Sequence, residues 1–148
     1  MKRIILTLAL FVSITAFASN KPVEVNEKVL KAFNETFSKA TDVVWQEYEN
    51  LYQANFKQDD IQVRAQYDQD GGLIKTIRYY GEKQLLPNIL SKLKKKYSSK
   101  EIFGVTETTS SEEVSFVITI RDQKNYILVK SDVYGNLEQT DKFQRADL

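Results

Sequence analysis

The chain of 148 residues contains no cysteine and no histidine. Without histidine there is no imidazole general base, no serine–histidine triad and no histidine ligand for a metal. Without cysteine there is no thiolate nucleophile, no cysteine-ligated zinc and no disulfide. These absences close most routes to hydrolytic and redox catalysis. We therefore expect that the protein is not an enzyme and that it uses no cofactor and no metal.

An excess of charge of one sign is also missing, because 21 lysines and arginines face 20 acidic residues. Proteins that bind nucleic acid normally need a basic surface to replace the counterions around phosphates, so no nucleic-acid partner is expected. A hydrophobic content of 42% and a charged content of 28% are typical of a folded chain. The length fits one ordinary domain or two very small lobes that share a core.

The N-terminus has the pattern of a secretory signal peptide over residues 1–18. Two positive charges at Lys2 and Arg3 precede a short apolar run over 4–14, and Ala16-Phe17-Ala18 supplies small residues before a cut. The apolar run is shorter than the roughly 20 residues that a membrane-spanning helix needs. We expect cleavage near Ala18-Ser19, a periplasmic or secreted mature chain and no membrane span in it.

A short motif occurs twice in the mature chain, 64 residues apart. Asp68 begins an Asp-x-x-Gly-x-Leu stretch that ends at Leu73, and Asp132 begins a second that ends at Leu137. Each stretch stands between two runs that favour β-strands, so each is interpreted as a hairpin turn. The repetition indicates one structural unit made twice.

Hydrophobic spacing predicts the same order of elements in both halves. The expected helices cover about 26–38 and 85–97, and the expected strands cover about 40–48, 52–57, 62–67, 73–80, 102–107, 114–121, 126–131 and 137–143. The fold class is therefore α+β, with one helix and four antiparallel strands in each tandem unit. The first unit spans 19–80 and the second 81–148. They are expected to form one continuous sheet or two abutting sheets, with both helices on one face and the other face open.

Several segments together resemble a known family. They are Ala32-Phe33, Phe37, the run 40–45 (ATDVVW), the run 52–56 (YQANF), the run 65–68 (AQYD) with Gly71, and Leu86-Pro87. In order and spacing they are similar to the PepSY-like, beta-lactamase-inhibitor-like family of secreted bacterial proteins. The resemblance covers nearly the whole mature chain. It implies two helix-and-sheet repeats like those of the beta-lactamase inhibitor protein, a location beyond the inner membrane, and an inhibitor-like or regulatory role.

Charged motifs in the chain have structural interpretations that we favour. A calcium-binding EF-hand loop from Asp68 would need glycine and glutamate where Leu73 and Tyr79 stand, so a tight turn is the better interpretation. The lysines over 92–96 could attract anionic lipid or polysaccharide, but they also complement the negative end of a helix dipole. Glu107 is the one carboxylate beside an apolar run that could raise its pKa.

The face of the sheet away from the helices is expected to differ between the two units. If Val63, Ala65 and Tyr67 face the helices, polar residues such as Arg64 point outward in the first unit, and Val117, Tyr126 and Leu128 point outward in the second. Exposed apolar patches commonly mark interfaces. Val117, Tyr126, Leu128 and Arg64 are therefore the candidate partner-binding residues. The alternative is that the strand phase is reversed and the three apolar residues belong to the core.

We expect a non-catalytic binding module that presents its sheet face to a protein or peptide of the cell envelope. The alternative is an envelope protein that binds a small molecule, lipid or glycan between the sheet and the helices. A deep apolar pocket would favour that alternative, whereas a wide, shallow face would favour a protein partner. The oligomeric state is left open by the sequence.

Overall fold

A computed structural model describes residues 23–146 of the chain. The expected signal peptide over 1–18 lies outside the described residues. Within 23–146, no helix is long and apolar enough to cross a membrane.

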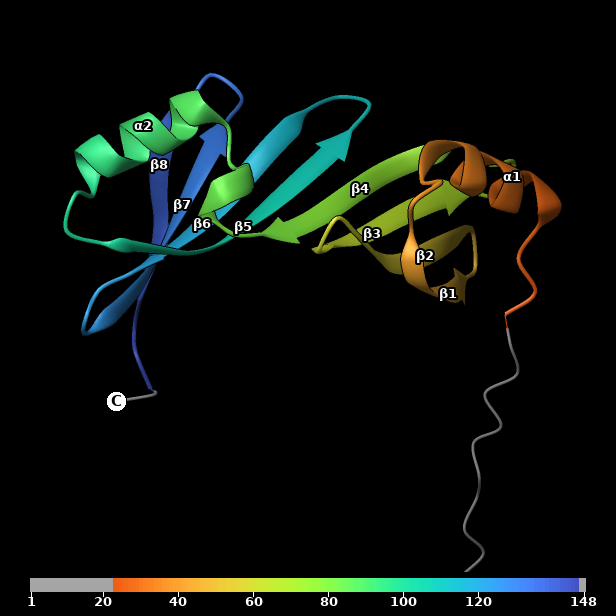
Figure 1. Cartoon of the computed structure of the whole chain (residues 1–148), viewed down its shortest axis with the longest axis horizontal. Coiled ribbons are helices and arrows are strands. Elements are labelled where there is room, and N and C mark those ends of the chain that lie inside the picture. Colours follow the sequence, from red (N-terminus) through yellow and green to blue (C-terminus); the bar gives the residue numbers. More distant parts are fainter. Residues whose placement is uncertain (1–22, 147–148) are drawn as a thin grey trace, which may run out of the picture.

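The described chain contains two α-helices, one short 3-10 helix and eight strands (Figure 1). Their bounds are α1 Glu27–Thr36, β1 Thr41–Tyr48, β2 Leu51–Gln58, β3 Ile61–Asp68, β4 Leu73–Tyr80, η1 Glu82–Gln84, α2 Pro87–Lys96, β5 Glu101–Ser110, β6 Val114–Arg121, β7 Asn125–Asp132 and β8 Leu137–Gln144. The order expected from the sequence is therefore found, with strand ends that differ by a few residues.

All eight strands form one antiparallel sheet in which every strand pairs with its neighbours in the sequence. Strands β4 and β5 join the two halves of the chain through a ladder that runs from Lys75 opposite Ser110 to Tyr80 opposite Val105. The sequence left open whether the two units form one continuous sheet or two abutting sheets, and the structure has one continuous sheet.

Both helices lie on the same face of this sheet, over its opposite ends (Figure 1). Across the strands, Ala65 lies opposite Thr76, Thr76 opposite Thr109, and Thr109 opposite Val114. The side chains of these four residues therefore point to the same face of the sheet. Alternate residues on this side supply most of the core. The buried strand residues are Ala54, Phe56, Ile61, Val63, Ala65, Tyr67, Tyr80, Val105, Phe116, Ile118, Ile120, Ile127 and Val129.

Helix α1 begins where the sequence predicts, because the Asn26 side chain accepts a hydrogen bond of 2.9 Å from the amide of Lys28. Its buried face presents Val29 and Phe33 to the sheet. The Phe33 ring packs edge-on against Trp45 and Phe56, with centroids 5.1 Å away in each case. Burial of side chains of this size stabilises the fold by about 1.5–3 kcal/mol each.

Helix α2 buries Ile89 and Leu93, and its Pro87 occupies the first turn, where no amide hydrogen is needed. Hydrophobic spacing in the expected helix over 85–97 places Leu86 on the same face as Ile89 and Leu93, but Leu86 is exposed and the neighbouring Leu85 is buried instead. The chain turns at Leu86, which precedes the helix, so its side chain does not follow the helical spacing.

Both Asp-x-x-Gly motifs form the tight turns that the sequence predicts. In the first, an Asp68 carboxylate oxygen accepts hydrogen bonds from the amides of Asp70 (2.9 Å) and Gly72 (2.7 Å). In the second, Asp132 accepts from the amides of Tyr134 (2.9 Å) and Asn136 (3.0 Å). The motif therefore connects β3 to β4 and β7 to β8.

Candidate binding face

The sheet face away from the helices, called the open face below, carries the other half of the alternating side chains. The register aligns Gln62 with Tyr79, Tyr79 with Thr106, Thr106 with Val117 and Val117 with Lys130 across five strands. This row contains polar residues at β3 and an exposed apolar residue at β6. Tyr79 on β4, in the first half of the chain, is also exposed, at 37%, so this row does not divide into a polar first half and an apolar second half as expected.

On β1 to β3 the open face is a network of amide side chains. Gln53 donates to Gln46 Oε1 at 2.9 Å, and Gln66 donates to Gln53 Oε1 at 2.8 Å. Arg64 Nε donates to Asn55 Oδ1 at 3.1 Å. The mutual hydrogen bonds of these groups limit how far the side chains can move. Val44 and Tyr48 on β1 point to the same face and are exposed, so this part of the face is polar at its centre and apolar along β1.

Val117, Leu128 and Tyr126 lie together on β6 and β7 of the open face. Leu128 pairs with Thr119 and Tyr126 with Arg121, both of which point to the same side as Val117. Val117 is 38% exposed, and Leu128 and Tyr126 are half-buried. The reversed strand phase, in which all three would belong to the core, is therefore wrong. Whether a partner binds them stays a prediction.

Arg64 lies on the same face but apart from these three residues. It is on β3, three strand spacings from Val117 on β6, or about 14 Å. Its guanidinium carbon is 6.0 Å from the centre of the Tyr79 ring. Arg64 thus belongs to the amide network, and a surface that includes it would have to span the middle of the sheet.

Two aromatic residues that sequence reasoning missed extend the apolar part of the open face. Phe103 is 54% exposed, and its ring centre is 5.3 Å from that of Tyr126. Phe143, which is 53% exposed, pairs with Tyr126 across β7 and β8. Phe103, Tyr126 and Phe143 are called the aromatic cluster below. A glycine inside a predicted strand indicates a bulge, and Gly104 was the available signal that Phe103 leaves the regular alternation.

Two arginines cover the outer edge of the aromatic cluster. The Arg121 guanidinium lies 4.7 Å from the centre of the Phe103 ring, and that of Arg145 lies 5.5 Å from Tyr126. Arg121 also makes a two-pronged ion pair with Glu101, at 2.8 and 2.9 Å. Stacking and pairing together hold these cations in fixed positions.

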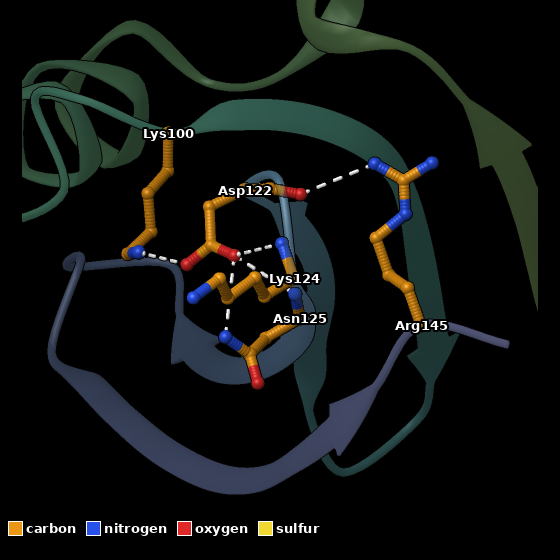
Figure 2. Close-up of polar contacts among 5 residues, drawn as sticks. All are labelled: Lys100, Asp122, Lys124, Asn125 and Arg145. Carbon is orange, nitrogen blue, oxygen red and sulfur yellow. Dashed lines mark hydrogen bonds and ion pairs between the residues drawn. The ribbon is translucent and has the colours of Figure 1, made fainter. Parts of the chain in front are cut away.

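Beyond these arginines, a cleft of about 700 Å³ opens between the start of β5 and the β6–β7 turn. It is called the turn cleft below, and it is lined by Ser99, Lys100, Glu101, Arg121, Asp122, Gln123, Lys124, Asn125 and Arg145. Figure 2 shows its polar contacts around Asp122. The Asp122 carboxylate pairs with Lys100 at 2.5 Å and accepts hydrogen bonds from the amides of Lys124 and Asn125, both at 2.8 Å.

The positive surroundings of the turn cleft lower the pKa values of both its carboxylates. The pKa of Asp122 lies well below its ordinary value, first because Lys100 bonds to it and then because two backbone amides do. The pKa of Glu101 is lowered by the hydrogen bond from Arg121, with further help from the nearby charges of Arg121 and Arg145. Both acids are therefore ionised and already bound by cations at neutral pH.

Glu107 lies on the helix side of the sheet, away from the open face. It is paired with Arg78 at 3.1 Å and accepts a hydrogen bond of 2.5 Å from the Tyr80 hydroxyl. These contacts link β4 to β5 across the junction of the two halves. Within residues 23–146, no group of three or more acidic side chains is placed to hold a metal ion.

The space between the sheet and the helices is largely filled by side chains. A pocket beside the end of α1, lined by Phe37, Ile61, Val63 and Arg78 among others, holds about 220 Å³. Another beside α2 holds about 20 Å³. Pockets for drug-sized ligands usually hold about 300–1,000 Å³, so both of these pockets are smaller than a drug-sized ligand needs.

Three lysines of α2 bond to neighbouring segments, two to the β7–β8 hairpin and one to η1. Lys92 donates to the carbonyl of Tyr134 at 2.8 Å, Lys94 pairs with Glu82, and Lys96 donates to the carbonyl of Leu137 at 3.5 Å. These contacts secure α2 to the rest of its half and support the structural interpretation of the lysine run.

No protein-family model matches the chain, and no curated protein sequence matches it. Solved structures do match. A BLIP-like protein from Bacteroides fragilis superposes with a TM-score of 0.65 at 16% identity, covering 84% of this chain and 91% of that one. A DUF2874 family protein from Bacteroides ovatus gives 0.64 at 17% identity, covering 85% and 92%.

A candidate periplasmic protein from Bacteroides eggerthii gives a TM-score of 0.62 at 12% identity and covers 82% of this chain and 90% of that one. Identities this low establish a shared fold. The fold found among these neighbours is thus the mixed one described above, with two helices on one antiparallel sheet.

Proposed function

We propose that this chain, which has the fold of BLIP-like proteins, is a non-catalytic binding module of the periplasm or cell exterior. The module presents its open face to a protein or peptide of the cell envelope. The location follows from the signal pattern with cleavage near Ala18-Ser19. Two tandem units over 19–80 and 81–148, as in the PepSY-like, beta-lactamase-inhibitor-like family, supply the sheet.

One observation carries the proposal: the open face joins three exposed and two half-buried apolar residues into a patch on a sheet side that neither helix covers. The patch consists of Phe103, Val117, Tyr126, Leu128 and Phe143. Aromatic residues with adjacent arginines are enriched where proteins bind one another. Such a broad surface suits a macromolecular partner better than a small ligand.

The test is affinity capture from an envelope extract with the mature chain as bait. Tyr126→Ala/Leu128→Ala removes two half-buried members of the patch, and Leu30→Ala/Leu86→Ala is a control that trims two exposed leucines on the helix side. We expect the first variant to lose the proteins that the wild type retains, by about tenfold or more in recovered amount, since apolar hot-spot residues contribute about 2 kcal/mol or more. The control is expected to retain them.

Circular dichroism verifies that both variants are folded before the comparison. If both folded variants retain the same proteins as the wild type, the open face is not the binding surface and the proposal is wrong.

A further inference from the structure

We infer that the partner of the open face carries an acidic peptide segment, and that its carboxylates dock in the turn cleft beside the aromatic cluster. The inference rests on the proposed function, because it names the chemistry of the partner at that same surface. The turn cleft and the open face are continuous: Arg121 lies against Phe103, and Arg145 lies against Tyr126.

Charge is the first observation that points to an acidic partner. The described residues that line the turn cleft include four cations, Lys100, Arg121, Lys124 and Arg145, and two carboxylates, Glu101 and Asp122. The mature chain, by contrast, has one more acidic than basic residue once Lys2 and Arg3 are removed. The positive charge is therefore concentrated locally, and it is complementary to an anion.

Fixed geometry is the second observation. Glu101 holds Arg121. Asp122 holds Lys100, and the carbonyl of Asp122 accepts a bond of 3.2 Å from Arg145 (Figure 2). A ligand that binds here does not have to order these long side chains, so it is spared the loss of side-chain entropy that binding normally costs. Lys124 has no ion pair within residues 23–146 and adds an accessible charge at the rim.

The neighbouring surface decides between a peptide and a uniform polyanion. Beside the cations stand Phe103 and Phe143, each more than half exposed, and these rings offer nothing to sulfate or phosphate groups. A peptide that alternates acidic and aromatic side chains would use both parts. At about 700 Å³ the cleft can accept more than one side chain.

The direct test measures binding of two labelled peptides to the mature chain by fluorescence anisotropy. One peptide has the sequence Glu-Phe-Asp-Phe-Glu, and its neutral twin is Gln-Phe-Asn-Phe-Gln. At about 0.05 M salt we expect the acidic peptide to bind about tenfold more tightly, and at about 0.5 M salt we expect most of that preference to disappear, because screening weakens exposed ion pairs. Equal binding of the twins at low salt would overturn the inference.

Variants locate the effect within the molecule. Lys124→Gln/Arg145→Gln should weaken the acidic peptide by roughly five- to tenfold and the neutral peptide by clearly less, since Arg145 also lies against Tyr126 of the aromatic cluster. Lys124→Gln alone, which removes one rim charge and keeps the backbone contacts of the turn, should weaken it by about threefold. The matched control Lys39→Gln/Lys95→Gln removes two exposed lysines on the helix side and should change nothing; an equal loss there means that net charge alone is responsible and the inference is wrong.

Two further measurements separate this inference from the proposed function and from other anions. If dextran sulfate or vesicles containing phosphatidylglycerol bind through the same lysine and arginine while the acidic peptide does not, the cleft is a polyanion site and the inference fails. In the affinity capture, loss of partners in Tyr126→Ala/Leu128→Ala but full retention in Lys124→Gln/Arg145→Gln would leave the proposed function standing and overturn the acidic segment.

Discussion

At the scale of single residues, two buried tyrosines have hydroxyl groups in opposite situations. The Tyr67 hydroxyl is buried and has no hydrogen-bond partner among the described residues, and burial raises its pKa to about 12. The Tyr80 hydroxyl donates to Glu107, and burial followed by this contact raises the pKa of Tyr80 as well. The Tyr67 hydroxyl has therefore lost its hydrogen bonds to water without gaining another among the described residues. The Tyr80 hydroxyl instead donates to the Glu107 carboxylate, whose side chain is 14% exposed.

Removal of each hydroxyl should accordingly have different effects on stability. Tyr67→Phe is expected to leave the free energy of unfolding unchanged or to raise it by up to about 1 kcal/mol, since no bond is lost. Tyr80→Phe keeps the ring and should lower the free energy of unfolding by about 1.5–3 kcal/mol, because a hydrogen bond to a charged group is lost. Urea denaturation followed by circular dichroism measures both. A clear loss in Tyr67→Phe would show that this hydroxyl has a partner, such as a water molecule.

The candidate site illustrates what single residues in a sequence can and cannot indicate. Alternation placed Val117, Tyr126 and Leu128 on the open face because the inward residues Phe116, Ile118 and Ile120 form an uninterrupted apolar series. The turn cleft could not be predicted in this way. Its cations come from three separate places in the chain, the start of β5, the β6–β7 turn and the end of β8, and only the strand register brings them together.

At the scale of elements, the two Asp-x-x-Gly turns share the hydrogen bonds from two backbone amides to the aspartate carboxylate but have different neighbours. Gly71 has a φ of +89° and Gly135 a φ of +77°, values that side chains other than glycine rarely adopt. A Cβ on Gly71 would lie 2.8 Å from the backbone carbonyl oxygen of Lys28 in α1. A Cβ on Gly135 would instead meet the flexible side chain of Lys92 at 3.0 Å.

The two glycines should therefore differ in their tolerance of alanine. Gly135→Ala should lower the free energy of unfolding by about 1–2 kcal/mol through its positive φ alone. Gly71→Ala carries the same strain and also pushes α1 from the sheet, so its loss should be at least about twice as large. Thermal or urea unfolding of the two variants provides the comparison. Equal losses would mean that α1 can shift without cost.

The order of the elements was predictable because alternating hydrophobic residues mark the strands and turn-forming residues separate them. The phase of β4, meaning which of its residues face the helices, was not predictable. Two features explain this. A bulge shifts the register between Gln66 and Tyr67, so Leu73 does not continue the alternation of the strand. Beyond it, the helix-facing residues are Thr76, Arg78 and Tyr80, a mostly polar set, because this part of the sheet lies between the two helices (Figure 1). The apolar residues Ile77 and Tyr79 lie on the open face instead, so hydrophobic alternation in the sequence favours the wrong side of β4 as the buried one.

At the scale of the whole molecule, the core is one apolar cluster that becomes narrow where a polar strip crosses the middle of the sheet. The strip contains Thr76, Arg78, Glu107 and Thr109 on β4 and β5, whereas Tyr80 and Val105 form a buried apolar bridge at one end. The backbone ladder between β4 and β5 and the contacts of Arg78 and Tyr80 with Glu107 cross this strip. A unit of about 60 residues buries only about 60% of its unfolded surface and is marginally stable alone. Each half should therefore depend on the other.

Because the halves depend on each other, a destabilising substitution in one half should also lower the unfolding midpoint measured in the other. Ile118 lies fully buried on β6, and Ile118→Ala should lower the free energy of unfolding by about 2–5 kcal/mol. Trp45, the one tryptophan of the chain, packs against Phe33 in the first half and reports on that half alone. In urea, the fluorescence midpoint of Trp45 should fall together with the circular dichroism midpoint of the entire sheet.

Val29→Ala in the first half is the control in which both signals must shift. If Ile118→Ala splits the two transitions and leaves the Trp45 midpoint unchanged, the halves fold independently and the β4–β5 ladder only tethers them.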